Sequence, residues 1–151
     1  MYSGNWLIER GAKIYPAFAG QAHRILVPQG IMIDVRPLSI DVPLEVVYAG
    51  GSESAGTIDM SPCLGLDIAA DRAIESVIME RIFKEVKVEY FDFAFYWKTI
   101  KGMEEDIDEN WKDEVIIPRE VIRRAHMIFK KRHPQTQIRV GNRMKLGVYM
   151  K

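Results

Sequence analysis

The chain has 151 residues, no formal net charge, and 48% hydrophobic and 28% charged side chains, a composition that excludes a disordered or fibrous protein. Its single cysteine, Cys63, excludes an internal disulfide, and no apolar run approaches the roughly 20 residues of a membrane-spanning helix. The first ten residues also lack the pattern of a secretory signal. We therefore expect one domain over residues 1–151, cytoplasmic or carried in a virion, with no membrane partner and no cofactor.

The first sixty residues predict mostly antiparallel strands, because short β-branched runs are separated by glycine and proline. Residues 23–27 and 31–36 are expected to form a hairpin, with Pro28 and Pro37 ending the two strands. Alternation in the second strand predicts two faces. The buried face would carry Ile31, Ile33 and Val35, and the face nearer solvent would carry Met32, Asp34 and Arg36.

A third strand is predicted at 44–49, followed by a glycine-rich segment at 50–56 that we expect to be a mobile loop. A helix start at Ser61 and Pro62 leads into a long central helix, regular from about 67 and ending near 86. Two apolar stripes on this helix predict contact on two sides, inside the domain or with another subunit. One stripe is Ala70, Ala73, Ile74, Val77, Ile78 and Ile82, and the other is Ile68, Met79, Phe83 and Val86.

Strict alternation predicts an aromatic strand at 90–97, and the acidic segment after it is expected to be a short helix or a loop. Pro118 opens a second, basic helix that is expected to end near His133. The segments 137–140 and 145–150 around Gly141-Asn142 indicate a C-terminal β-hairpin. Together these elements predict an α+β fold.

Charge is segregated toward the C-terminus. Residues 103–114 carry a net charge of −6, and residues 115–151 carry +9. On the second helix, Arg119, Arg123, His126, Lys130 and His133 recur at spacings of three or four and share one face. We take as the candidate contact surface for nucleic acid or a protein partner Arg119, Arg123, Arg124, His126, Lys130, Lys131, Arg139, Arg143 and Lys145. The candidate acidic patch is Glu104, Glu105, Asp106, Asp108 and Glu109.

These charges allow three arrangements. The basic helix can pair with the acidic segment of the same chain, the two patches can pair between identical subunits, or the basic patch can contact phosphates. The second arrangement needs buried area as well, which the aromatic strand and the second face of the long helix could supply.

A weaker pattern is the recurrence of Asp67, Asp71 and Glu75 every four residues on the long helix, which could in principle hold a divalent cation. No set of polar residues has the spacing of a catalytic site, so we assign no catalytic and no metal residues.

The function that we expect is that of a non-catalytic assembly or adaptor subunit of a homo-oligomeric particle, for example a phage head, neck or tail. Its partners would be copies of itself or other assembly subunits. The alternative is a nucleic-acid-binding module that uses the basic C-terminal surface, and a third is a metal-dependent hydrolase.

Overall fold

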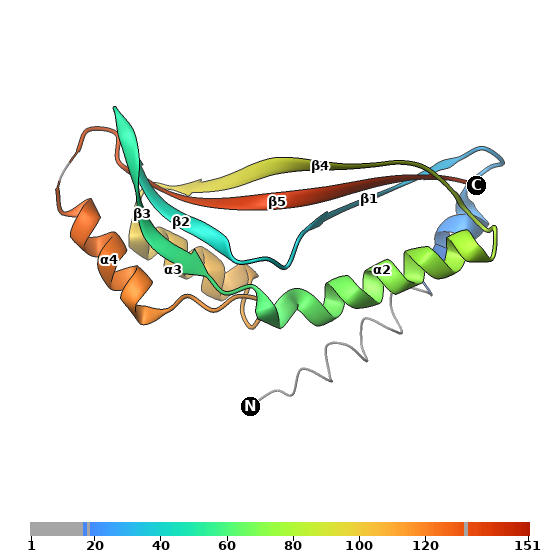
Figure 1. Ribbon diagram of the computed structural model, residues 1–151, viewed down its shortest axis with the longest axis horizontal. Coiled ribbons are helices and arrows are strands. Elements are labelled where there is room, and N and C mark those ends of the chain that lie inside the picture. The colour runs from blue at the N-terminus through green and yellow to red at the C-terminus, as the bar shows by residue number, and fades with distance from the viewer. Residues whose placement is uncertain (1–16, 18, 132) are drawn as a thin grey trace. The chain divides into compact units, whose positions relative to one another are not determined.

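The computed structural model describes residues 17, 19–131 and 133–151 (Figure 1). Its α+β fold confirms the predicted class. In chain order the elements are β1 (Ile31–Pro37), β2 (Val42–Tyr48), β3 (Gly51–Ile58), the 3-10 turn η1 (Ser61–Cys63), α2 (Leu64–Met79), β4 (Lys84–Trp97), α3 (Ile100–Asn110), α4 (Arg119–Phe129) and β5 (Gln137–Met150). No helix in the described part of the chain is both long and apolar enough to cross a bilayer.

The five strands form one sheet in the order β1-β5-β2-β3, with β4 also paired to β5. β5 is antiparallel to β1 from Met144 to Met150 and antiparallel to β2 from Gln137 to Val140. β2 and β3 form an antiparallel hairpin whose turn is Ala49-Gly50. β5 therefore connects the largest number of strands.

The chain divides into two compact units. Unit 1 comprises the described residues up to Leu38 together with Cys63–Phe91 and Met144–Lys151, and unit 2 comprises Ser39–Pro62 and Asp92–Arg143. β4 and β5 each contribute residues to both units. Each unit has a hydrophobic core of its own.

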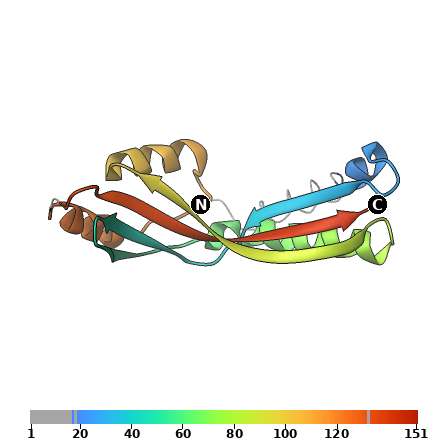
Figure 2. The same ribbon diagram turned by 90° about the horizontal axis from the view of Figure 1, so that it is seen from above.

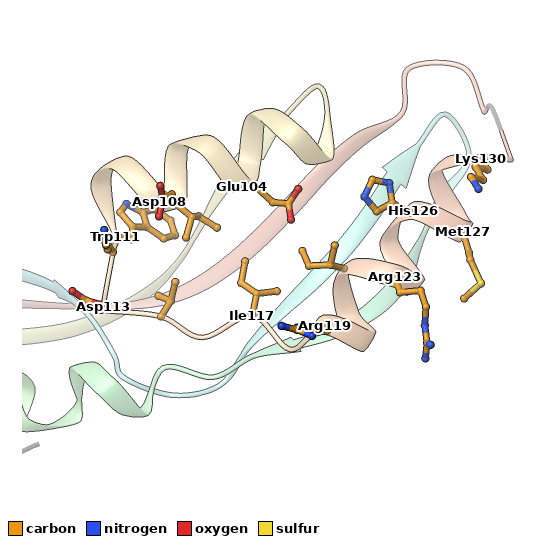
Figure 3. A pocket seen from close by; sticks show the side chains of 14 residues that line it. Glu104, Asp108, Trp111, Asp113, Ile117, Arg119, Arg123, His126, Met127 and Lys130 are labelled. Atoms are coloured by element: carbon orange, nitrogen blue, oxygen red, sulfur yellow. The ribbon is translucent and has the colours of Figure 1, made fainter. Parts of the chain in front are cut away.

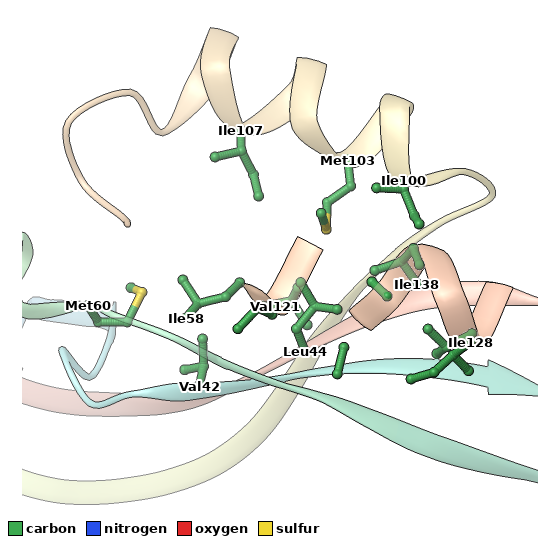
Figure 4. Packing of buried hydrophobic residues seen from close by; sticks show 14 residues of the cluster. Val42, Leu44, Ile58, Met60, Ile100, Met103, Ile107, Val121, Ile128 and Ile138 are labelled. Atoms are coloured by element: carbon green, nitrogen blue, oxygen red, sulfur yellow. The ribbon is translucent and has the colours of Figure 1, made fainter. Parts of the chain in front are cut away.

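The core of unit 2 lies where α3 and α4 pack against β2, β3 and the first half of β5. Leu44 and Ile138 are fully buried in the strands, and Ala125 of α4 is fully buried against them. Figure 4 shows Ile100, Met103 and Ile107 pointing from α3 into the same cluster. Their spacing of three, four and seven residues makes one helical face, which explains why α3 is a helix rather than a loop.

The core of unit 1 lies on the side of β1 and β5 that faces α2. Met32 of β1 and Tyr149 of β5 pack with Val77 of α2, and Phe83, just after the helix, completes the cluster. In Figure 1, α2 runs beside these strands, and Figure 2 shows β5 between β1 and β4. α2 ends at Met79 rather than near residue 86, and Ile68 and Met79 of its second apolar stripe are exposed.

Three sequence predictions about secondary structure are wrong. Residues 19–25 are helical rather than a strand, because Ala19 and Leu26 pack in the unit 1 core and His23 meets Phe83 edge-to-face. Residues 51–56 belong to β3 rather than to a mobile loop. Their backbone N–H and C=O groups pair with β2, and this pairing orders the segment although its side chains are small.

The third error is the C-terminal hairpin. β5 is one continuous strand through Gly141 and Asn142, because β2 and β1 hold its two halves in succession. The turn preference of Gly141-Asn142 is outweighed by the strand pairing along the fourteen residues of β5.

Candidate interaction surfaces

α3 and α4 flank an open groove of about 820 Å³ within unit 2. Its apolar lining comes from Ile107, Trp111, Val115, Ile117, Ile122 and Met127. Figure 3 shows Glu104 and Asp108 on the α3 side and Arg119, Arg123 and His126 on the α4 side. The groove thus has one acidic wall, one basic wall and an apolar floor.

The acidic wall follows from the way α3 packs. Because Ile100, Met103 and Ile107 face the core, Glu104 and Asp108 are left exposed beside the groove. The other three residues of the predicted acidic patch do not line the groove. Glu105 pairs with Lys101 at 3.3 Å, Asp106 accepts a 2.8 Å hydrogen bond from Trp97 Nε1, and Glu109 is exposed.

The basic wall follows in the same way from α4. Val121, Ala125 and Ile128 are buried, and the predicted face of Arg119, Arg123, His126 and Lys130 lines the groove. Arg124 is exposed but lies outside this lining. Among the residues that the structure describes, no salt bridge joins these side chains to the predicted acidic patch, so the two walls do not neutralise each other by contact.

The other four residues of the predicted basic surface are held by carboxylates elsewhere. Lys131 donates to Glu53 at 2.6 Å, and this hydrogen bond lowers the pKa of Glu53. Arg139 pairs with Glu45, its direct cross-strand neighbour. Arg143 donates to Asp92 at 2.8 Å, and Lys145 to Asp71 at 2.7 Å. Only the α4 residues therefore remain as a candidate cationic surface.

Of the three predicted carboxylates on the long helix, Asp67 and Asp71 lie beside cations. Asp71 accepts from Lys145 at 2.7 Å and from Arg36 at 2.8 Å, and Arg36 also donates to Asp34. Burial opposes ionisation of Asp71, but the hydrogen bonds from Lys145 and Arg36 outweigh it, and its pKa is lowered. Asp67 lies 3.9 Å from Arg36, and Glu75 is exposed. The described residues contain no cluster of three or more metal-ligating side chains.

The outer face of unit 1 is the sheet surface turned away from α2, and here the predicted alternation of β1 is reversed. Met32 is buried, and Asp34 and Arg36 are half-buried, in the network beneath α2. Ile31, Ile33 and Val35 are 54%, 61% and 48% exposed. The prediction that these three are buried is wrong, because it is the placement of α2 that decides which face is covered.

β5 extends this outer face. Ile31, Ile33 and Val35 lie directly opposite Met150, Val148 and Leu146, so these six side chains share one side of the sheet. Burial raises the pKa of Tyr149, and the nearby charges of Asp34 and Glu85 add to the rise. In β4, which pairs with β5, Val86 and Tyr90 are 55% and 50% exposed, and Val88 is half-buried.

The aromatic half of β4 is a strand, as predicted. Some of its aromatic side chains are packed in unit 2, and others are exposed. Phe95 and Trp97 contact Trp111 at ring-centroid distances of 4.6 and 6.1 Å in unit 2. Phe91 and Phe93 are exposed. The sequence pattern could locate this strand, but it could not separate the packed rings from the exposed ones, because α3 and the segment after it decide which are covered.

The charged groove and the outer face are both made of residues that the sequence singled out, in combinations that it could not show. Comparison of the chain with protein-family models, with curated proteins and with solved structures gave no match.

Proposed function

We propose that the protein is a non-catalytic subunit of a homo-oligomeric assembly. The observation that carries this proposal is the outer face, where Ile31, Ile33 and Val35 are exposed; Val86 and Tyr90 of β4, in the same sheet, are exposed as well. A contiguous apolar surface of this kind on a folded protein marks an interaction site. An isologous contact would cover the same surface on both copies.

Burial of these side chains contributes enough free energy to support association. Complete burial of an aliphatic side chain contributes roughly 1.5–3 kcal/mol, so the five half-exposed side chains would contribute on the order of 5 kcal/mol per copy. Association costs about 4–15 kcal/mol in lost rotational and translational freedom, so contacts from both copies are needed. The half-buried Leu146, Val148 and Met150 widen the same surface.

The test is the molar mass of the protein in solution, measured by sedimentation over a range of concentrations. We expect the parent chain to be an oligomer and Ile33→Lys to shift it toward monomer, because a charge in the middle of an apolar contact would be desolvated. Met79→Lys is the matched control, since Met79 is 83% exposed and lies on α2, not on the outer face.

A parent chain that stays monomeric at high concentration would refute the proposal. Equal loss of association in the Ile33 and Met79 variants would instead show that the outer face is not the contact. Circular dichroism of each variant should match the parent, because both substituted side chains are exposed. The particle that we propose for such a subunit is a symmetric one, with a phage head, neck or tail as the example.

A second candidate function is nucleic-acid binding by α4. It is favoured by the cationic side chains of this helix, which form no salt bridge with the acidic patch among the described residues. Binding of single- or double-stranded DNA should then weaken steeply with salt, and Arg123→Glu with Lys130→Glu should abolish it. Retained binding in that variant, or binding insensitive to salt, would exclude this candidate.

A further inference from the structure

β4 is a long edge strand. It has fourteen residues and pairs with β5, and no second strand in the described residues pairs with it. Most of its side chains are exposed over the whole length. An edge of this length presents unpaired backbone N–H and C=O groups, which a further strand can satisfy.

The first part of β4 has a charge pattern that is complementary to its own reverse. Counted outward from Val88, Lys87 is matched by Glu89, Val86 by Tyr90, and Lys84 by Asp92. Each basic residue on one side of Val88 therefore has an acidic residue at the same distance on the other side. The apolar Val86 is matched with Tyr90, whereas the remaining pair sets Glu85 opposite Phe91. In an antiparallel pair, residues at equal distances from a two-fold axis lie directly opposite each other.

We propose that β4 of one copy pairs antiparallel with β4 of a second copy, across a two-fold axis at Val88. Lys87 would then face Glu89 of the second copy, and Lys84 would face Asp92, each contact occurring twice by symmetry. Val86 would face Tyr90 of the second copy. This inference rests on the self-association proposed above and names one of its interfaces.

Charge selects this register over its neighbours. A shift by one residue in either direction places one copy's core-facing side chains beside the other copy's outer-face side chains. The next register that keeps the faces matched sets Glu89 opposite Glu89 in one direction and Lys87 opposite Lys87 in the other. Like charges directly opposite are destabilising in a sheet, whereas opposite charges stabilise it.

The side chains concerned are available for this contact. Lys87 and Glu89 form a 2.6 Å salt bridge along the strand, and they are 55% and 54% exposed, so both can also reach a second strand. Asp92 uses Oδ1 to accept from Arg143 and leaves Oδ2 for Lys84.

The pairing would also bring Val86, Val88 and Tyr90 of the two copies together across the axis. A sheet continuous over both copies would cover each β4 edge from Lys84 to Asp92. This shortens the unprotected part of the edge strand.

Charge reversal with rescue is the first test. Lys87→Glu and Glu89→Lys should each weaken dimer formation roughly tenfold, because every copy gains like-charge contacts across the axis. The double variant restores opposite charges and should return the dissociation constant to near the parent value. Lys101→Glu, which removes an exposed ion pair on α3, is the matched control and should have no effect.

Oxidative cross-linking is the second test. Cα atoms facing each other in an antiparallel pair lie about 4.5–5.5 Å apart, within the range of a disulfide. In a Cys63→Ser background, Val88→Cys should form a disulfide-linked dimer under mild oxidation. Thr57→Cys, an exposed site on β3 in the same background, should not.

The outcomes separate the two proposals. A monomeric parent overturns both. If the parent is an oligomer whose mass is unchanged by either single reversal, and Val88→Cys does not cross-link, self-association stands and the β4 interface is overturned. Two weakened single variants without rescue in the double variant would overturn the register at Val88.

Discussion

At the residue scale, Gly56 allows α4 to approach β3. Its φ is +139°, and a Cβ built there would lie 2.7 Å from Val121 Cγ2. Gly56→Ala should therefore lower the free energy of unfolding by about 2–4 kcal/mol, from backbone strain and overpacking together. Chemical denaturation measures this loss.

Gly50 provides the control for that variant. Its φ of +108° is also positive, but a Cβ there would meet nothing within 4 Å. Gly50→Ala should report backbone strain alone, about 1 kcal/mol. An equal loss of unfolding free energy at both positions would show that the clash with Val121 does not destabilise Gly56→Ala.

Asp71 makes stability depend on pH. Its pKa in the folded protein lies below the ordinary 3.8, so it stabilises the fold above that pH, and the contribution is lost as pH falls through the folded pKa. Asp71→Asn should cost about 1 kcal/mol at pH 7, a small value because the carboxylate is 46% exposed and screened by solvent.

The measurement is the free energy of unfolding as a function of pH for the parent and Asp71→Asn. Their difference should shrink as pH falls below about 4 and vanish in strong acid. Glu75→Gln on the same helix, where the carboxylate is exposed, is the control and should leave stability unchanged. A gap between parent and Asp71→Asn that persists in acid would show that the ion pairs are not its cause.

At the element scale, α3 depends on a cap at its first turn. Thr99 precedes the helix, and its Oγ1 accepts a 3.0 Å hydrogen bond from the backbone N–H of Gly102. Thr99→Ala should lower the free energy of unfolding by about 1 kcal/mol. Thr99→Ser should lower it by much less, because the serine hydroxyl can accept the same hydrogen bond. If denaturant unfolding shows equal losses for the two variants, the cap hydrogen bond is not what stabilises α3.

Elements with strong periodicity could be predicted, and elements that depend on distant partners could not. The basic helix expected from Pro118 is α4, Arg119–Phe129, because Val121, Ala125 and Ile128 repeat at helical spacing. The strand 44–49 matches β2, and the aromatic strand lies within β4. β3 was not predicted, because its glycines and serines do not form the alternating apolar pattern of a strand. Its pairing with β2 is what makes it a strand.

At the scale of the whole molecule, the two units share strands β4 and β5, and we expect them to unfold together. Phe83→Ala in the unit 1 core and Leu44→Ala in the unit 2 core should each cost about 3 kcal/mol. In both variants the transitions seen by circular dichroism and by tryptophan fluorescence should coincide, because loss of either strand removes support from both cores.

Separate transitions would instead show two domains and contradict the single domain expected from chain length. Ile25→Ala is the control, since Ile25 is exposed and its truncation should move the transition little. Coincident transitions at a lower midpoint are the expected result.

The sequence by itself determined the α+β class, the positions of α4 and the aromatic strand, and the separation of acidic from basic residues, because these depend on local periodicity and composition. Only the tertiary structure decided which face of each strand is covered. Alternation in β1 defines two faces, but the position of α2 makes Met32 buried and Ile33 exposed. The same holds for charge: Lys145 and Arg139 find carboxylates across the sheet, whereas α4 keeps its cations beside a groove. Strand pairing and ion pairing join residues far apart in the chain, and no local pattern encodes such contacts.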